Sequence, residues 1–419
     1  MTNDATISAD ASIDVNASKI SLYDRFFEIN TVDPALYNQY QVKRGLRNDD
    51  GTGVVAGVTN ISNVHGYILS DHEKVPDEGV LTYRGYNVED LLKGTDSTNR
   101  YCFETICYLL LNGDLPTRTQ LDQFIAAIDS QRELPEGFTA HYIMNPPTPD
   151  LMNALARSVL LLYASDSHAE DRTPKHEIMT AISLLSRLPR ISVLAYYAMR
   201  VAFFKESMIM HRFIPGQSTA ETILSMLRVN RTFSPEEAHM LDILLCLHAE
   251  HGGGNNSTFT CRVLTSSDTD PYSTYAAALG SLKGNRHGGA NAKVLAMQYD
   301  IREQVSNWNN DDEIADYLAR ILRKEVFDKT GLIYGMGHAV YTLSDPRATI
   351  CRDFATELAH GTEHEAELEL LKSIERLAPQ VIEQIKGTNK QVCANVDMYS
   401  GFVYSMLGIP EVLITPLFA

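Results

Sequence analysis

Four short segments place ionisable side chains beside glycines, and these side chains are the best candidates for chemistry. The segments are LHAEHGGGNNSTF with His248 and His251, NRHGGAN with His287, GMGHAVYTLSDPR with His338, and NVDMYSG with Asp397. Glycine lets a backbone turn tightly and lets a ligand approach it closely. Imidazole and carboxylate groups are common general acids and bases in proteins. The joint pattern therefore indicates an acid–base site.

Taken singly, each segment also has a structural interpretation. A histidine that follows a helix is stabilised by the helix dipole and can cap carbonyl groups. Asp397 alone is typical of a helix N-cap. His248 and His251 could bind a metal with His287 as the third ligand, although no HExxH motif is present. The chain also has no phosphate-binding GxxxxGK[ST] loop and no G-x-S-x-G elbow, and we predict no metal.

The elements that must position these residues are predicted to be mostly helices. Apolar residues follow a helical spacing in segments 103–111, 150–165, 175–201, 234–248, 271–284 and 345–360. We expect segment 175–201 to form two helices separated at Pro189. Short β-like runs occur only near Tyr67 and at residues 81–83. The sequence thus predicts a mainly all-α fold with at most a small β-hairpin near the N-terminal part.

Two of these helices carry strong start signals. Ser234, Pro235 and Glu237 match a capping box with proline in the first turn. Asp345 and Pro346 repeat the N-cap and proline pattern before segment 345–360. We therefore expect the helix before His248 and the helix that holds Arg347 to begin at these residues.

Composition narrows the classes of function. The 44% hydrophobic and 21% charged residues are near the globular average, and the formal net charge is -17. Such an acidic chain is a poor match for nucleic acid or an anionic membrane. The six cysteines form no CxxC pair, which is typical of reduced thiols, and we expect most of them to be buried. No signal peptide or long apolar span is apparent, so we expect a cytoplasmic protein with no membrane partner.

In their order along the chain, the four segments resemble the citrate synthase family, which includes 2-methylcitrate synthases. The resemblance continues upstream through GVLTYRGYNVEDLL, FETICYLLLNGDLPT and SRLPRI. It implies an acyltransferase that condenses acetyl-CoA with oxaloacetate and then hydrolyses the thioester to citrate, with no cofactor. It also implies a helical homodimer with a large domain, residues 1–288 and 409–419, and a small domain, residues 289–408, that closes over the cleft.

The resemblance also implies a role for each candidate residue. Asp397 would be the base, His287 would donate a hydrogen bond to the thioester oxygen, and His338 would polarise the ketone of oxaloacetate. The oxaloacetate site would consist of His251, Asn255, His338 and Arg347, with His248 in support. Coenzyme A would contact Gly335, Gly337, Arg286 and Lys324.

Elementary chemistry agrees with these roles. An aspartate with its ordinary pKa of about 3.9 is a weak base, and desolvation in a closed cleft would raise that pKa. A helix start beside His287 would favour neutral imidazole, because the positive end of the helix dipole disfavours imidazolium. For Arg347, the alternative is a surface arginine in the first turn of a helix, where its charge opposes the dipole.

Two departures from the family pattern leave alternatives open. Gly252 stands where the family often has glutamate, and we expect this to change local support rather than chemistry. The sequence ends at Ala419, before a segment that carries two further substrate arginines in the family, and we expect the natural chain to continue. The rival functions are 2-methylcitrate synthesis from propionyl-CoA, a non-catalytic helical binding protein derived from the family, and a metal-dependent hydrolase.

Overall fold

The computed structural model describes residues 33, 35–39, 54, 58–70, 73–284, 287–387 and 391–419. The chain divides into two compact units, residues 1–56 and residues 57–419. Within the first unit, the described residues include one short helix, α2 (Ala35–Gln39). The second unit holds every candidate site residue that the structure describes.

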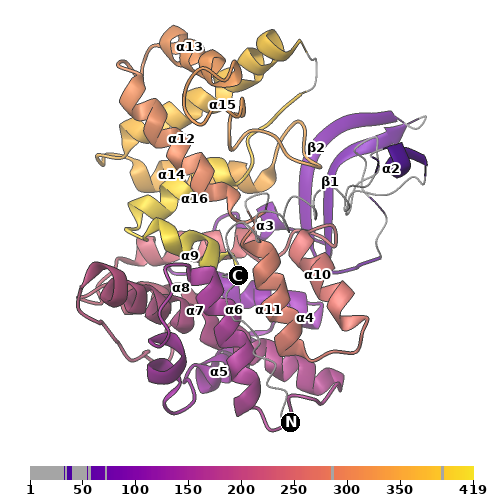
Figure 1. The fold of residues 1–419 in the computed structure, drawn as a ribbon, viewed down its shortest axis with the longest axis vertical. Helices are drawn as coiled ribbons and strands as arrows, with labels where there is room; N and C mark the ends of the chain where they lie inside the picture. The colour runs from indigo at the N-terminus through magenta and orange to yellow at the C-terminus, as the bar shows by residue number, and fades with distance from the viewer. Residues whose placement is uncertain are drawn as a thin grey trace, which may run out of the picture. The chain divides into compact units, whose positions relative to one another are not determined.

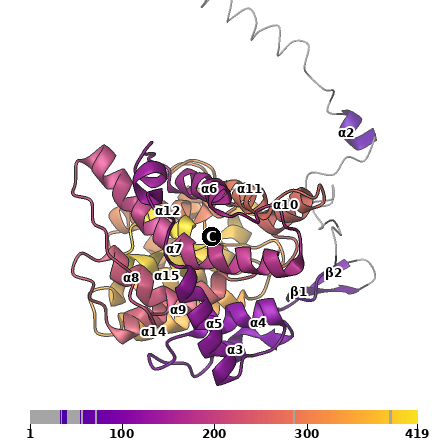
Figure 2. The same ribbon diagram turned by 90° about the horizontal axis from the view of Figure 1, so that it is seen from below.

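A small antiparallel sheet opens the second unit. Strands β1 (Ser62–Ser70), β2 (Glu73–Tyr83) and β3 (Tyr86–Asn87) lie in that order. Ser62 pairs with Tyr83, and the register shifts between His65 and Tyr67. Figures 1 and 2 both show the β1–β2 hairpin at the edge of the helical part. The predicted hairpin is confirmed. Tyr67 in β1 pairs with Pro76 in β2, and residues 81–83 in β2 pair with residues 62–64 in β1.

The rest of the described second unit is mainly helical, as predicted. The helices up to the first histidine segment are α3 (Val88–Leu92), α4 (Cys102–Asn112), α5 (Arg118–Gln131), the π-helical η1 (Thr139–Ile143), α6 (Leu151–Leu162), the short η2 (Tyr163–Ser165), α7 (Pro174–Phe204), α8 (Thr219–Leu227) and α9 (Pro235–His248). They are followed by α10 (Asn256–Thr265), α11 (Pro271–Leu282), α12 (Ala290–Gln304), α13 (Asp311–Leu322), α14 (Pro346–Ala359), α15 (Glu365–Lys386), α16 (Asp397–Met406), η3 (Glu411–Leu413) and α17 (Ile414–Leu417).

Helix α9 lies at the centre of the fold. Every residue from 238 to 247 is buried, and the helix packs against α4, α8, α14 and α16. Its predicted capping box is confirmed, since Ser234 and Glu237 exchange side-chain and backbone hydrogen bonds at its start. Asp345 likewise caps α14 as predicted. Because α9 is fixed along its whole length, the histidines at its end have a defined position.

Helix α7 corrects one prediction. Segment 175–201 does not form two helices, because α7 runs through Pro189 without a break. Proline inside a helix costs about 3 kcal/mol. Beyond Pro189, Ile191, Val193 and Leu194 are buried, and each fully buried aliphatic side chain contributes about 1.5–3 kcal/mol. Packing therefore outweighs the local cost. Among the described helices, α7 alone has the length and apolar composition of a membrane span, but half of that stretch is buried, as in a core helix.

The hairpin is tied to the end of α9 and to the loop before α14. The Tyr83 hydroxyl donates to the carbonyl oxygens of Cys246 and Glu250, at 3.0 and 3.1 Å. The Gly79 N–H donates to Ser344 Oγ at 3.0 Å. These contacts fix the two segments that supply histidines and arginine to the candidate site. Four of the six cysteines are buried, and all six are free.

Candidate active site

A glycine-rich loop between α13 and α14 holds His338 close to the start of α16. Gly335 and Gly337 have φ values of 81° and 91°, which favour glycine. The Gly337 N–H donates to the Cys393 carbonyl at 2.7 Å, and the Asn395 N–H donates to the Gly335 carbonyl at 2.9 Å. This short backbone pairing joins the loop of His338 to the segment that leads directly into Asp397.

Backbone hydrogen bonds define the tautomer of His338. Its Nδ1 accepts from the N–H groups of Val340 and Tyr341, at 3.1 and 3.2 Å. An imidazole nitrogen that accepts carries no proton, so the ring proton of neutral His338 is on Nε2. The ring stacks on Tyr341 with centroids 4.7 Å apart. His338 is thereby prepared to donate a hydrogen bond from Nε2.

His251 meets His338 edge to face. The two ring centroids are 5.0 Å apart with an interplanar angle of 90°. Burial lowers the pKa of His251 well below its ordinary value, and the charge of Arg347 lowers it further. Burial lowers the pKa of the neighbouring His248 to about 3, and its ring stacks on Phe418 at 3.7 Å. Both imidazoles are therefore neutral at physiological pH.

Arg347 is a buried cation at the start of α14. Its side chain is 10% exposed, so the alternative of a surface arginine is wrong. Its Nε and Nη2 donate to the two carboxylate oxygens of Asp345 at 3.0 and 2.7 Å, and the guanidinium lies 5.8 Å from the centre of the Tyr341 ring. The same aspartate accepts from the Arg347 N–H as the helix cap. Asp345 thus both starts the helix and orients the guanidinium.

Asp397 is the first residue of α16, and its carboxylate does not cap that helix. The N-cap position is Val396, and the Asp397 N–H donates to the Asn395 side-chain oxygen at 3.0 Å. The Asp397 carboxylate accepts from Asn291 Nδ2 at 3.2 Å, and the same amide donates to Ser400 Oγ at 2.8 Å. Burial raises the pKa of Asp397, while the bond from Asn291 and the charge of Arg347 oppose that rise. The helix-cap interpretation of Asp397 is therefore wrong.

His287 lies between α11 and α12, as its sequence context predicts. Its Nε2 is 3.0 Å from Ser257 Oγ in α10. Burial lowers the pKa of His287, so the expected neutral imidazole is present with burial as its cause. Asn291, the partner of Asp397, is on the first turn of α12 that follows. Helix α12 therefore connects His287 to the carboxylate.

Two cavities open beside the imidazole pair. One, of about 290 Å³, is lined by His248, His251, Asn255 and Ser257. The other, of about 170 Å³, is lined by Gly337, His338, Tyr341 and Lys386 among others. His251 and His338 touch each other and line different cavities. Neither His287 nor Asp397 lines either of them.

The remaining candidates have mixed placements. Asn255 caps α10 by accepting from the N–H groups of Ser257 and Thr258, and it also lines the larger cavity. Gly252 has a φ of 82°, a conformation that favours glycine, and a Cβ there would meet Val64 at 3.0 Å. Lys324 is an exposed residue just beyond α13. Arg286 lies outside the described residues.

Sequence reasoning missed several residues at this site. Asn291 is within the segment HGGAN and Tyr341 is within the segment GMGHAVY. Their spacing from the histidines did not indicate a role in the site. Ser257 is close behind Asn255 and becomes notable only when α10 and α11 place it against His287. Lys386 reaches the smaller cavity from the far end of α15, and no local motif signals it.

Comparisons with known proteins agree with this architecture. A sequence model described as citrate synthase, C-terminal domain, matches residues 48–419. A citrate synthase of Synechocystis sp. PCC 6803 is 32% identical over 88% of this chain and 82% of its own length. Citrate synthase 2 of Bacillus subtilis is 33% identical over 88% of this chain and 87% of its own. The solved citrate synthase of Pyrobaculum aerophilum superposes with a TM-score of 0.68 at 26% identity, covering 87% of this chain and 84% of its own.

The fold and the matches together define a mainly α-helical enzyme. The chain belongs to the citrate synthase family, whose model spans nearly all of the described residues.

Proposed function

We propose that this protein condenses acetyl-CoA with oxaloacetate and hydrolyses the resulting thioester, which yields citrate and free coenzyme A. The observation that carries the proposal is the half-buried Asp397 carboxylate, which Asn291 orients and which follows the segment paired with the loop of His338. Carboxylate, neutral imidazoles and a buried arginine are the groups that this reaction needs.

The first step is removal of a methyl proton from the acetyl group. Asp397 accepts that proton, and burial supports this role because it raises the pKa of the carboxyl group. The electron pair of the broken C–H bond moves into an enolate. His287 stabilises the enolate oxygen. The Ser257 hydroxyl lies 3.1 Å from the Ala278 carbonyl oxygen, to which it can donate, and 3.0 Å from Nε2 of His287. In this step the hydroxyl turns its proton to Nε2, so the ring proton of His287 is on Nδ1 and can be donated to the enolate oxygen.

The second step forms the carbon–carbon bond. The enolate carbon attacks the ketone carbon of oxaloacetate, and the ketone oxygen takes the proton of His338 Nε2 to become the alcohol. The backbone donors to Nδ1 keep the proton on Nε2 before attack. Water then cleaves the thioester: its oxygen joins the acyl carbon, one of its protons leaves with the coenzyme A thiol, and the other returns His338 to neutral imidazole. Asp397 releases the methyl proton to solvent, so one proton is produced per turnover.

Oxaloacetate binding is assigned to Arg347, His251, Asn255 and His338. Arg347 offers a planar guanidinium that suits a carboxylate, and its Nη1 makes no hydrogen bond to any described residue. Coenzyme A binding is assigned to Gly335, Gly337, Arg286 and Lys324, as the sequence predicts. We add Lys386 as a phosphate partner, because it lines the same cavity as Gly337 and His338.

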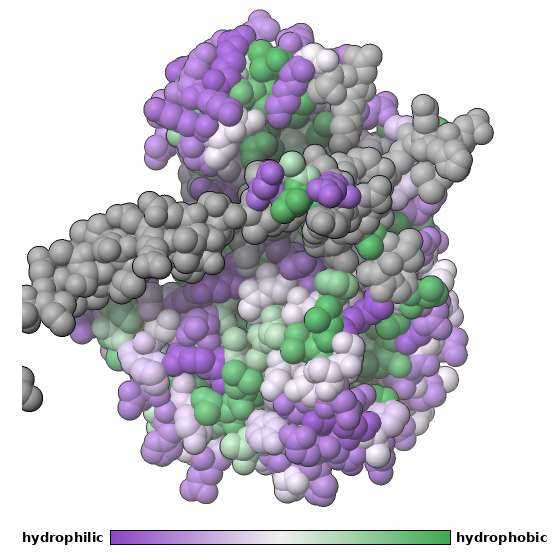
Figure 3. Space-filling view, turned by 45° about the vertical axis from the view of Figure 1, so that its right-hand side comes forward, coloured by the Kyte–Doolittle hydropathy of each residue, from purple (hydrophilic) through white to green (hydrophobic). Residues whose placement is uncertain are grey.

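The remaining features of the proposal follow the family. The protein works in the cytoplasm as a homodimer without a cofactor, and its small domain, residues 289–408, closes over the large one. His287 and Asp397 line neither cavity. In the proposal, domain closure brings these two side chains to the bound substrates. Exposed apolar residues at both ends of α7, among them Met179 and Phe204, support association through that helix. Figure 3 shows one face where hydrophobic patches, in green, interrupt the hydrophilic surface.

The test is release of free thiol from acetyl-CoA, measured with and without oxaloacetate. We expect release only with both substrates. Release without oxaloacetate would indicate a hydrolase, and no release under either condition would indicate a binding protein. Propionyl-CoA in place of acetyl-CoA tests 2-methylcitrate synthesis, because one methylene changes specificity by only about 1–3 kcal/mol.

Replacing the base gives the sharpest prediction. Asp397→Asn keeps the side-chain shape and an acceptor for Asn291 but cannot take the methyl proton. We expect thiol release to fall by about a thousandfold or more, while oxaloacetate binding measured by calorimetry is retained. Asp353→Asn, on the exposed side of α14, is the matched control and should be fully active. Normal turnover by Asp397→Asn would contradict the assignment.

A further inference from the structure

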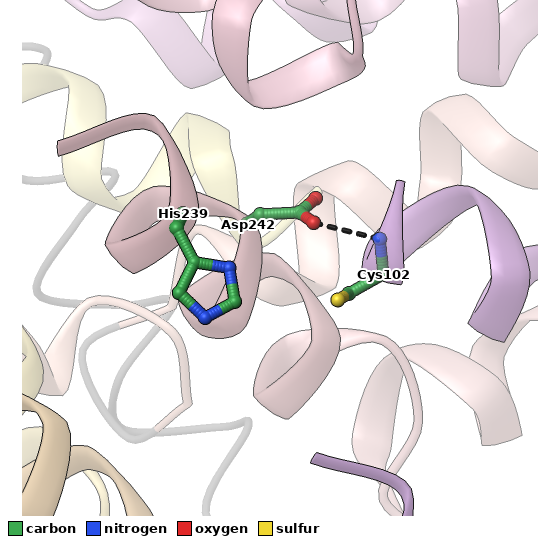
Figure 4. A group of neighbouring side chains, drawn as sticks. All are labelled: Cys102, His239 and Asp242. Carbon is green, nitrogen blue, oxygen red and sulfur yellow. Dashed lines mark hydrogen bonds between the residues drawn. The ribbon is translucent and has the colours of Figure 1, made fainter. Parts of the chain in front are cut away.

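A second cluster of reactive side chains lies where α4 meets α9, apart from the candidate active site. Cys102 begins α4, while His239 and Asp242 are on α9. One potential ligand atom of each lies within 4.8 Å of the other two. Figure 4 shows the three side chains converging from the two helices. A thiol, an imidazole and a carboxylate form a donor set suited to zinc.

Asp242 is already held in place for such a role. Its two carboxylate oxygens accept from the N–H groups of Cys102 and Phe103, at 2.7 and 3.2 Å. The side chain is 1% exposed. The carboxylate therefore caps α4 from a neighbouring helix and retains lone pairs that can accept further bonds.

His239 is the anomaly that points to a ligand. Its side chain is 8% exposed, and neither ring nitrogen has a hydrogen-bond partner of normal geometry among the described residues. Buried polar groups are nearly always hydrogen-bonded, and an unpartnered one in a native fold requires an explanation. The ring is neutral and offers one lone pair.

The local charge also favours a cation. Two carboxyl groups, those of Asp242 and Glu104, are buried in this part of the core. The buried Arg132 nearby is already paired with Asp129. Arg100, which lines the adjoining cavity, is paired through two nitrogens with Glu221. No unpaired cation among the described residues faces Asp242.

An adjoining cavity provides room for a fourth ligand. It has a volume of about 180 Å³ and is lined by His239, Asp242, Ser97, Ser218 and the Arg100–Glu221 pair. Phe233, Pro235 and Ala238 complete the lining. The volume of the cavity and the polar part of its lining suffice for an ordered water. Tetrahedral ligands of zinc lie about 3.3–3.8 Å apart, given bond lengths of 2.0–2.3 Å. Side-chain shifts on the order of 1 Å would bring the three ligand atoms to that spacing.

We propose that Cys102, His239 and Asp242 form a binding site for a divalent ion of the zinc class, with water from the cavity as the fourth ligand. Binding replaces the thiol proton of Cys102 with the metal, and that proton passes to solvent. The ion joins the start of α4 to the helix that ends at His248, and so it stabilises the folded chain. The site is independent of the proposed reaction.

The test uses the intact protein, stripped with a chelator, dialysed and titrated with Co²⁺ as a spectroscopic substitute for Zn²⁺. We expect one Co²⁺ per chain, an absorption band from thiolate-to-cobalt charge transfer, and loss of that band when Zn²⁺ displaces the cobalt. Zn²⁺ should also raise the melting temperature. Cys102→Ser should abolish the band, and His239→Gln should weaken binding at least tenfold. Cys107→Ser, a buried cysteine in the same helix, is the matched control and should behave as wild type.

The outcomes separate clearly. Circular dichroism of the metal-free variants shows whether each one folds, and His239→Gln decides the question if Cys102→Ser does not. Absence of the sulfur band in the wild type would overturn the proposal, even if the ion binds elsewhere. Persistence of the band at full affinity in a folded His239→Gln variant would overturn it equally.

Discussion

At the residue scale, the site depends on imidazoles that are neutral for different reasons. Burial alone keeps His287 neutral, whereas burial and a neighbouring guanidinium keep His248 and His251 neutral. The Nδ1 of His338 is instead occupied by backbone donors. Neutral imidazole can donate a hydrogen bond without adding charge, which suits stabilisation of an enolate.

Asn291 provides the first residue-scale prediction. Its amide orients the Asp397 carboxylate, and hydrogen bonds to charged groups contribute about 1.5–3 kcal/mol. We expect Asn291→Ala to lower kcat by about 10–150-fold, with little change in KM for oxaloacetate. Gln298→Ala is the matched control, because Gln298 is buried in the same helix and bonds to the Met398 carbonyl instead. Equal losses in both variants would mean that Asn291 acts only through packing.

His248 provides a prediction on pH and stability. Its folded pKa of about 3 is below its ordinary value of 6.5, so below pH 6.5 the unfolded chain binds a proton that the folded chain does not. The free energy of unfolding therefore falls as the pH drops from 6.5 toward 3, by about 2 kcal/mol at pH 5. In urea unfolding at pH 7.5 and 5, His248→Phe should lose about that much less stability than wild type.

At the element scale, the loop before α14 must approach α16 closely. Gly335 combines a positive φ with a position where a Cβ would lie 3.1 Å from Met398 Cε and 3.2 Å from its Cα. Gly408 has a φ of 66° and nothing within 4 Å of such a Cβ. A substitution at Gly408 would therefore strain only the backbone, whereas a substitution at Gly335 would also create a steric clash with Met398.

Alanine substitutions at these positions should differ in their effect on activity. We expect Gly335→Ala and Gly408→Ala each to lose about 1 kcal/mol or more of stability from the left-handed backbone. Only Gly335→Ala should also lower kcat, because it pushes the His338 loop away from Asp397. Melting temperature and thiol release measure the two effects. Unchanged kcat in Gly335→Ala would contradict the positioning role of this contact.

At the scale of the whole molecule, caps and apolar spacing predicted the helices well because those signals are local. The starts of α9 and α14 follow from Ser234 and Asp345. The predicted break at Pro189 was wrong, because tertiary packing, which is not a local signal, outweighs the free-energy cost of proline inside a helix. The four histidine and aspartate segments marked the site, but Asn291, Lys386 and the Cys102 cluster depend on contacts between distant helices. The division at residues 288 and 409 stays a prediction.

The pairing of Arg347 with Asp345 has a consequence for the rate of substrate capture. The chain has a formal net charge of -17, and the arginine described at the site is already neutralised by its partner. An approaching dianion therefore experiences repulsion rather than attraction at long range. Added salt screens that field, so kcat/KM for oxaloacetate should rise with ionic strength between about 0.01 and 0.15 M. A steep fall over the same range would show that a free cationic funnel guides the ligand.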